Sequence, residues 1–237
     1  SATATIAVTS QNDAPIAHDT AARGAEDATS IPVILSGSDV DGTVASFTLG
    51  ALPTNGTLYL DAAHSQPVVP GTPIPAGAGG TTTLYFVPAP NWNGTTDFPY
   101  TVTDNDNLAS PPATATIEVT PQNDAPVAND TAAHGAEDAA SIPVTLSGSD
   151  MDGTVASFTL GALPTNGTLY LDAAHTQPVT AGTPIPAGTG GTTTLHFVPA
   201  PNWNGETRFP YTATDNDNLA SAPAEARITV DSVNDAP

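Results

Sequence analysis

The sequence predicts an all-β protein built from two tandem domains, and three observations lead to that prediction. Residues 13–123 align without a gap to residues 124–234, a period of 111 residues with 21 differences. The 24 prolines and 20 glycines interrupt the chain every few positions, which favours short strands and turns over helices. Within each copy, apolar residues alternate at a period of two between turn signals. Since 111 residues is far longer than a solenoid repeat, each copy should fold around its own core.

Seven strands are predicted in the first copy, at residues 16–22, 31–36, 43–49, 57–61, 82–87, 97–103 and 113–120. Leu58 and Leu60 should share one buried face. Thr54-Asn55-Gly56-Thr57 predicts a type I′ hairpin turn, and residues 67–83 a loop without periodicity. Seven short strands in about 100 residues are typical of an immunoglobulin-type antiparallel β-sandwich. We therefore expect two such sandwiches, joined end to end.

Differences between the copies support the predicted faces of the last strand. Ala113, Ala115, Ile117 and Val119 should point inward, and they are matched by Ala224, Ala226, Ile228 and Val230. The polar positions between them exchange freely, since Thr114, Thr116 and Glu118 become Glu225, Arg227 and Thr229. Exchange between polar and charged residues is expected on a face in contact with water.

The repeat also sets the expected domain limits. We expect residues 13–123 and 124–234 to be the two domains and residues 235–237 to begin a third junction, so that the array continues in a longer protein. Residues 1–12 match residues 112–123 and are interpreted as the orphaned last strand of a preceding repeat. The alternative is a split domain, in which that strand opens a sandwich and the Asn-Asp-Ala-Pro link follows it.

The charge balance is strongly acidic and excludes several functions. Three Lys or Arg residues stand against 24 Asp or Glu, giving a formal net charge of −21. So few cations exclude nucleic acids and anionic membranes as partners. No apolar run approaches the roughly 20 residues of a membrane helix. The absence of cysteine excludes disulfides and thiolate metal sites.

Fifteen of the 24 acids belong to short motifs that occur at the same offsets in both copies, all between predicted strands. In an immunoglobulin-like topology, the second-to-third and sixth-to-seventh strand loops meet at the end where the chain enters the domain. The first-to-second strand loop lies at the opposite end. The residues of these motifs, with the adjoining asparagines, are the candidate metal ligands: Asn12, Asp13, Glu26, Asp27, Asp39, Asp41, Asp104, Asp106, Asn123, Asp124, Glu137, Asp138, Asp150, Asp152, Asp215, Asp217, Asn234 and Asp235.

The link between the copies should gather seven of these acids. They are Glu26, Asp27, Asp124, Asp150, Asp152, Asp215 and Asp217. Seven carboxylates close together repel one another unless they are neutralised, and two or three divalent ions would do so. Carboxylate and amide oxygens on flexible loops, without histidine or cysteine, favour calcium over zinc or copper. The sequence therefore predicts calcium as the cofactor. Aspartate and asparagine are also good turn formers, so one such motif alone would be weak support.

These motifs together resemble the cadherin-like tandem repeats of large bacterial surface adhesins, including the extender regions of RTX adhesins exported by type I secretion. The resemblance rests on Asn-Asp-Ala-Pro, Glu-Asp, Asp-x-Asp-Gly, Gly-Thr-Leu-Tyr-Leu, Phe-Val-Pro-x-x-Asn-Trp-Asn-Gly and Tyr-Thr-Val-Thr-Asp, and it covers essentially the whole chain. It implies an extracellular, cell-surface array of domains stiffened by calcium. Its partners would be calcium and neighbouring repeats, and the adhesive ligand would be bound elsewhere in the full protein, in attachment or biofilm formation. The Asp-Arg-Glu motif of cadherins is missing.

Three function classes were compared. A structural spacer of an adhesin accounts best for near-duplicate copies, because repetition sets length. The alternative is a calcium-dependent carbohydrate-binding module of a secreted protein, with Trp92 or the loop at 67–83 holding a sugar. We favour Trp92 and Trp203 as residues that pin a loop, and His64 and His175 as solvated loop histidines. An enzyme is not expected, because no paired acid and base or nucleophile motif is present.

Overall fold

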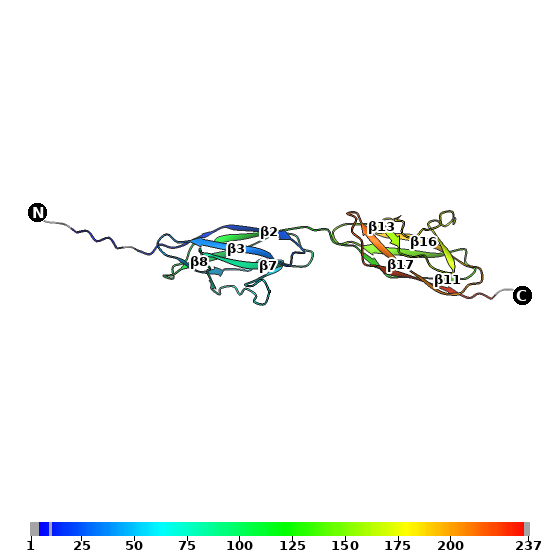
Figure 1. Ribbon diagram of the computed structural model, residues 1–237, viewed down its shortest axis with the longest axis horizontal. Coiled ribbons are helices and arrows are strands. Elements are labelled where there is room, and N and C mark those ends of the chain that lie inside the picture. The colour runs from blue at the N-terminus through cyan, green and yellow to red at the C-terminus, as the bar shows by residue number, and fades with distance from the viewer. Residues whose placement is uncertain (1–4, 10, 235–237) are drawn as a thin grey trace. The chain divides into compact units, whose positions relative to one another are not determined.

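A computed structural model describes residues 5–9 and 11–234 of the chain, which separate into two units (Figure 1). The first unit comprises Ser1–Gln122 and the second Asn123–Pro237. The prediction of all-β tandem sandwiches is confirmed, since the described residues form strands and contain no helix. Of residues 1–12, residues 5–9 have no strand, and residues 1–4 and 10 lie outside the described residues.

Among residues 5–9 and 11–234, each unit has nine strands. In the first unit they are β1 (Ile16–His18), β2 (Thr20–Ala25), β3 (Ile31–Ser38), β4 (Val44–Leu49), β5 (Gly56–Tyr59), β6 (Ile74–Pro75), β7 (Thr81–Pro88), β8 (Gly94–Asp104) and β9 (Ala113–Thr120). In the second unit they are β10 (Val127–Asn129), β11 (Thr131–Ala136), β12 (Ile142–Ser149), β13 (Val155–Leu160), β14 (Gly167–Tyr170), β15 (Ile185–Pro186), β16 (Thr192–Pro199), β17 (Gly205–Asp215) and β18 (Ala224–Asp231).

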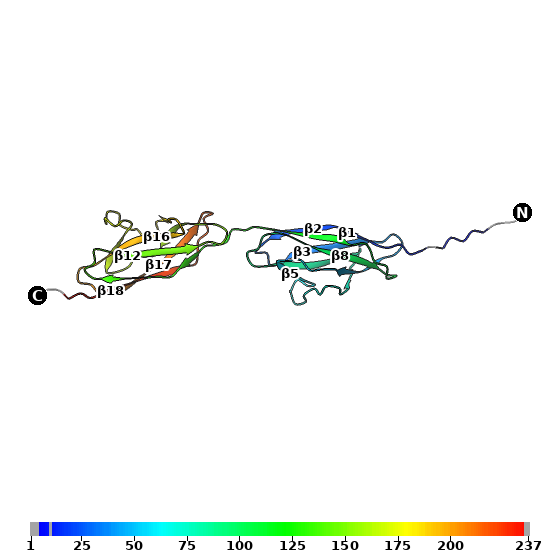
Figure 2. The ribbon, with the colours of Figure 1, turned by 180° about the vertical axis from the view of Figure 1, so that it is seen from behind.

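The strands form two sheets in each unit. One sheet has the order β1-β3-β7-β5 and the other β2-β9-β8-β4-β6, and the second unit repeats both orders. The predicted first strand, residues 16–22, is in fact broken at Asp19, and the strands on either side of it, β1 and β2 (both labelled in Figure 2), belong to different sheets. The Asp19 carboxylate accepts the Thr114 backbone N–H at 2.8 Å. Beyond it, β2 pairs with β9 in parallel, as β11 does with β18 in the second unit, and these two pairs depart from the antiparallel pattern expected.

The core of each unit lies between its two sheets. Alternate residues of β9 are buried as predicted, with Ala115 and Ile117 fully enclosed and Thr114 and Glu118 exposed. Buried aromatic side chains of β4, β7 and β8 fill the centre of the first core. Each sandwich is therefore a scaffold that fixes the loops at its two ends.

The predicted hairpin at Thr54-Asn55-Gly56-Thr57 is wrong. The strands on either side, β4 and β5, belong to different sheets, and only Asn55 has a positive φ, of 58°. Gly56 is required for a different reason, because a Cβ there would lie 2.3 Å from the Phe86 ring. Leu60, expected to be buried beside Leu58, is exposed just beyond the end of β5.

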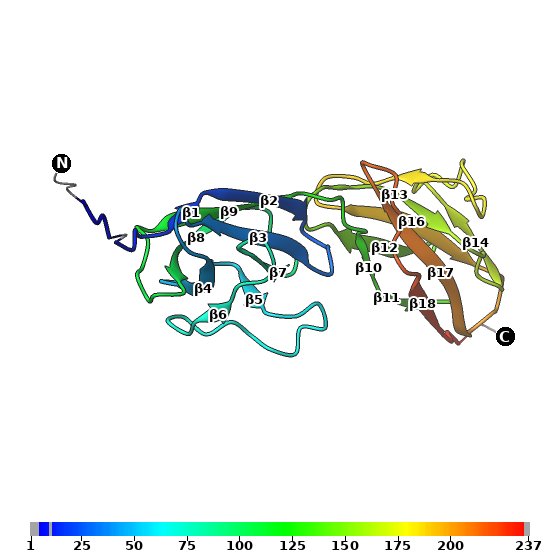
Figure 3. The same ribbon diagram turned by 60° about the vertical axis from the view of Figure 1, so that its left-hand side comes forward.

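The predicted loop at 67–83 contains one short strand and extends over the first three residues of β7. Residues 74–75 form β6, which pairs with β4 on a long excursion between β5 and β7 (Figure 3). The excursion returns through a glycine turn in which Gly80 accepts the Gly37 N–H at 2.9 Å. Gly80 has a positive φ, and a Cβ there would lie 2.6 Å from the Gly37 carbonyl oxygen. Only glycine fits so close an approach.

Candidate metal centre

The loops that carry the candidate ligands meet at two ends of each sandwich. The N-terminal pole is defined as the β3–β4 loop, the start of the β8–β9 loop and the residues that precede β1, with their equivalents in the second unit. The C-terminal pole is the loop after β2, the β7–β8 loop and the residues that follow β9, again with their equivalents. The sequence-based topology placed these loops at these ends.

At the N-terminal pole of the first unit, the incoming chain is bonded to both loops. The Asn12 side chain donates to Asp104 Oδ2 at 2.7 Å. The Asp13 N–H donates to Asp41 Oδ2 at 3.2 Å, and the Asp41 N–H donates to Asp39 Oδ1 at 3.3 Å. The loops and the chain before β1 thus form one bonded group.

The second unit repeats this arrangement with equivalent residues. Asn123 donates to Asp215 Oδ2 at 2.7 Å, and the Asp124 N–H donates to Asp152 at 3.3 Å. The Asp152 N–H donates to Asp150 Oδ1 at 3.4 Å. Agreement between copies that differ elsewhere indicates that these motif residues determine the geometry.

Asp104 and Asp215 are buried carboxylates, each 1% exposed. Burial opposes ionisation of Asp104, but hydrogen bonds from Asn12, Leu108 and Asp106 outweigh it, so its pKa lies below the ordinary value. The pKa of Asp215 is lowered in the same way by its equivalent donors, against the effect of burial. Both therefore stay ionised at neutral pH without a cation beside them.

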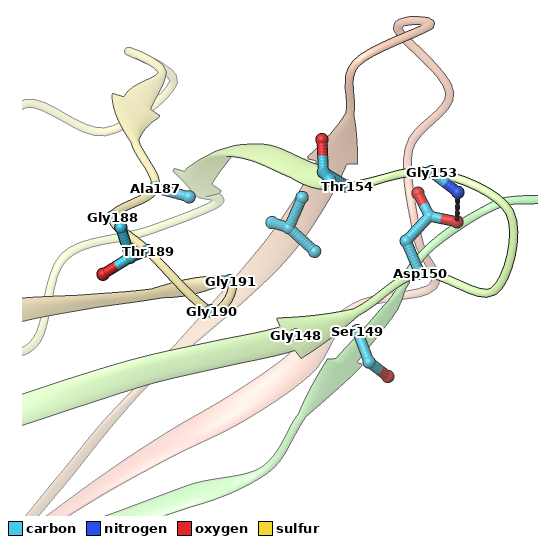
Figure 4. Close-up of a pocket in the computed structure, with 11 residues that line it drawn as sticks. Gly148, Ser149, Asp150, Gly153, Thr154, Ala187, Gly188, Thr189, Gly190 and Gly191 are labelled. Atoms are coloured by element: carbon cyan, nitrogen blue, oxygen red, sulfur yellow. Dashed lines mark hydrogen bonds between the residues drawn. The ribbon is translucent and has the colours of Figure 1, made fainter.

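Asp39 and Asp150 each have one carboxylate oxygen, Oδ2, that is buried and accepts no hydrogen bond. Each of these residues lines a pocket between the β3–β4 loop, or its equivalent, and the glycine turn. The pocket measures about 380 Å³ in the first unit and about 530 Å³ in the second. In Figure 4, the Asp150 carboxylate points toward Gly153, and its Oδ1 accepts the Gly153 N–H at 3.2 Å.

At the C-terminal pole, a buried glutamate holds the outgoing chain. Glu26 is 4% exposed, accepts the Gln122 N–H at 2.7 Å through Oε1, and accepts the Asn93 side chain at 3.2 Å through Oε2. Glu137 repeats this with the Val233 N–H at 2.7 Å and the Asn204 side chain at 3.4 Å. The neighbouring Asp27 and Asp138 are exposed.

The structure thus brings together most of the predicted residues within each unit, but not as a finished metal cage. Among residues 5–9 and 11–234, no three His, Asp or Glu side chains converge closely enough to hold a metal ion. Asp106, Asp217 and Asn234 are exposed, and Asp235 lies outside the described residues. The ligand atoms at the poles are carboxylate and amide oxygens, which are the types that fit calcium, and the Oδ2 atoms of Asp39 and Asp150 accept no hydrogen bond. That both units contribute ligands to one calcium site stays a prediction.

Sequence reasoning missed two groups of residues. Asn105 joins the two loops of the N-terminal pole, because its Oδ1 accepts the Thr43 N–H at 2.6 Å, as Asn216 does for Thr154 at 2.7 Å. Asp61 closes its own turn by accepting the Ser65 N–H at 2.9 Å, and hydrogen bonds from Ser65 and Gln66 lower its pKa against burial. Repetition at the same offset in both copies was the available signal.

The predictions for the loop tryptophans and the loop histidines have different outcomes. Trp92 and Trp203 pack against the cores, as expected of residues that pin a loop. His64 is not a solvated loop histidine: its Nε2 is buried and its ring lies 5.2 Å from that of Tyr59. His175 repeats this against Tyr170.

A family model described as "Bacterial Ig domain" matches residues 12–120 and 123–231. No curated protein matches the sequence. No helix in residues 5–9 and 11–234 is long and apolar enough to cross a membrane.

Solved structures with similar folds include an endo-fucoidan hydrolase of glycoside hydrolase family 107, 16% identical with a TM-score of 0.36. The alignment covers 93% of this chain but only 29% of the hydrolase. The sialic acid binding region of a Streptococcus sanguinis adhesin is 11% identical with a TM-score of 0.33, covering 94% and 79% of the two chains. Drosophila N-cadherin EC1-3 is 12% identical with a TM-score of 0.31, covering 94% and 69%. Likenesses at these scores carry no argument about function.

Proposed function

Because this chain belongs to the bacterial Ig domain family and holds two copies in tandem, we propose that it is a calcium-stiffened spacer of a bacterial surface adhesin. In this role it would hold an adhesive region, located elsewhere in the full protein, away from the cell. The proposal includes an extracellular location, export with an RTX-type adhesin by type I secretion, a part in attachment or biofilm formation, and no enzymatic activity.

One observation carries the proposal. In both units, acid-bearing loops are hydrogen-bonded to the residues that lead into the sandwich, through Asn12 and Asp13 or, in the link between the two units, through Asn123 and Asp124. Ligands for a cation would thus act on the link itself. A cation bound there would change how freely one domain pivots on the next.

The electrostatics support calcium as the cation. None of the three arginines lies in a pole loop, since Arg23, Arg208 and Arg227 are in strands β2, β17 and β18. The repulsion among pole carboxylates is therefore not relieved by basic side chains nearby. Calcium takes six to eight oxygen ligands in flexible geometry, and extracellular modules bind it at roughly 10⁻⁴–10⁻³ M. At a hundred times Kd, each bound ion would stabilise its site by about 2.7 kcal/mol.

A calcium titration of the two-unit chain, followed by small-angle scattering and thermal denaturation, tests the proposal. Calcium should raise the melting temperature and lengthen the mean particle, and chelator should reverse both effects. Scattering profiles that coincide in excess calcium and excess chelator would refute calcium stiffening.

A matched pair of double variants locates the effect at the link. Asp152→Asn with Asp217→Asn removes two exposed acids from the pole that follows the link, and should abolish the calcium-dependent change in scattering. Asp41→Asn with Asp106→Asn removes the same charges from the equivalent pole of the first unit, and should leave that change in place. Equal losses in both variants would point to a general charge effect instead.

A further inference from the structure

The link between the units is held on both sides by carboxylates of the protein itself. On the first side, Glu26 accepts the Gln122 N–H at 2.7 Å. Glu26 is 4% exposed, and its second oxygen is occupied by the Asn93 side chain. The outgoing chain is therefore fixed to the first unit as far as Gln122.

On the other side, the next residue is already fixed to the second unit. The Asn123 side chain donates to Asp215, which is 1% exposed and accepts the N–H groups of Asp217 and Leu219 at its other oxygen. Gln122 and Asn123 are adjacent in sequence, so only the backbone torsions of these two residues and the side-chain torsions of Asn123 lie between the anchors. No free spacer residue remains.

The same contacts recur at the other ends of the two units. Asn12 donates to Asp104 at 2.7 Å before the first sandwich, and the Val233 N–H donates to Glu137 at 2.7 Å after the second. Four carboxylates thus bond to the chain on either side of the two sandwiches, two through an asparagine side chain and two through a backbone N–H. All four are buried, and each accepts hydrogen bonds at both of its oxygens.

We propose that Glu26 and Asp215, with Glu137 and Asp104, are positioning residues that clamp the link without metal, rather than calcium ligands. A buried carboxylate whose two oxygens already accept hydrogen bonds gains less from a cation than an exposed carboxylate does, because the donors already stabilise its charge and a cation would have to fit beside them or displace them. The exposed acids, such as Asp27, Asp152 and Asp217, and the unbonded oxygens of Asp39 and Asp150 are left to bind calcium. This division of roles rests on the proposed function, whereas the clamp itself does not.

Amide hydrogen exchange by NMR on the metal-free two-unit chain tests the clamp. The Gln122 and Val233 amides should be protected in the wild type. Glu26→Ala should speed exchange at Gln122 about tenfold or more, as expected for loss of a hydrogen bond to a charged group. Val233, held by Glu137, should not change and serves as the internal control.

Glu26→Gln separates shape from charge. The new amide oxygen can still accept the Gln122 N–H. If the Asn93 amide flips, its oxygen can accept an N–H from the new amide nitrogen. This variant should therefore restore the protection that Glu26→Ala loses. Unprotected Gln122 in the metal-free wild type, or an unchanged exchange rate in Glu26→Ala, would overturn the clamp.

Calorimetric calcium titration of the same chain tests the division of roles. Glu26→Gln should leave the calcium affinity within about twofold of the wild type, whereas Asp27→Asn, its exposed neighbour, should lower it by about threefold or more. A tenfold loss in Glu26→Gln would make Glu26 a ligand and overturn the proposal. A wild type that binds no calcium would refute the proposed function and leave the amide exchange result standing.

Discussion

The two units have the same acids at their poles but different charges on one outer face. On strands β17 and β18 of the second unit, Glu206, Arg208, Glu225 and Arg227 form a network, with Arg208 Nε 2.8 Å from Glu206 and Nη1 3.2 Å from Glu225. The equivalent positions of the first unit are Thr95, Asp97, Thr114 and Thr116. There a single pair, Arg23 with Glu118 at 3.6 Å, lies on the neighbouring strands.

This difference separates two uses of charge. On the face, the acids of the second unit come with arginines, whereas the first unit has three threonines and one acid, Asp97, at the equivalent positions. At the poles, the acids are the same in both copies and come without basic partners. The pole acids therefore serve a role common to both units, and the face charges do not.

The largest expected difference between the units comes from the core. Val102 and Ala213 occupy equivalent, fully buried positions. Val102→Ala should lower the free energy of unfolding of the first unit by about 1–3 kcal/mol, through lost burial and a new cavity. Denaturant unfolding of the full chain measures this.

The reciprocal change is the control. Ala213→Val should leave the second unit as stable or make it more stable, because a valine, Val102, already occupies the equivalent buried position of the near-identical first core. An unchanged free energy of unfolding in Val102→Ala would contradict the expected difference in stability between the two cores.

The next largest effect, from loss of a buried tyrosine hydroxyl, should be equal in the two units. The Tyr100 hydroxyl donates to the carbonyls of His18 and Ser36, the latter at 3.1 Å, and so ties β1 to β3. Tyr211 does the same with Asn129 and Ser147, at 3.2 Å to Ser147. Tyr100→Phe and Tyr211→Phe should each cost about 1 kcal/mol of unfolding free energy. Costs that differ by more than about 0.5 kcal/mol would show that the two contacts are not equivalent.

Acid should weaken the hydrogen bond between an asparagine and a buried aspartate, Asn12 with Asp104 and Asn123 with Asp215, in both units. Hydrogen bonds lower the pKa values of Asp104 and Asp215, so their stabilising effect is present above the ordinary carboxyl value of 3.8 and is lost as pH falls through the folded value. Asn12→Ala and Asn123→Ala should therefore destabilise their units at pH 7, and the deficit should shrink below pH 3.8. Thermal melts at each pH, compared with the wild type, remove the general effect of net charge. A deficit of the same size at pH 2 and pH 7 would contradict the assignment.

Most of the sandwich could be predicted from the sequence because alternation reports which side of a strand is buried. The faces of β9 and the positions of the pole loops followed from that pattern and from the repeat. The break at Asp19 could not be predicted, because the change of sheet depends on Thr114, 95 residues away. The hairpin predicted at Asn55-Gly56 was wrong for a related reason. The glycine is needed there because the Phe86 ring of another strand lies against it, and not because the chain forms a hairpin turn.

The candidate site was predicted as a list of residue types, and its internal geometry was not. Spacing could not distinguish Glu26, buried with both oxygens occupied, from its exposed neighbour Asp27. It also gave Asn105 no role, because the bond that Asn105 accepts from Thr43 spans 62 residues. Burial and long-range hydrogen bonds are properties of the folded chain, and they determine which acids remain available to a cation.

The smallest expected effect lies on the face that differs. Glu206 is hydrogen-bonded to Arg208, which lowers its pKa, but the arginine is more than half exposed. Exposed ion pairs contribute little and are screened by salt, so Glu206→Thr, which restores the residue of the first copy, should shift the melting temperature only slightly. That shift should shrink further between low and high salt, whereas the effect of Tyr211→Phe should not. A shift as large as that of Tyr211→Phe, unchanged by salt, would mean that the face network supports the second fold and that the two units are stabilised by different means.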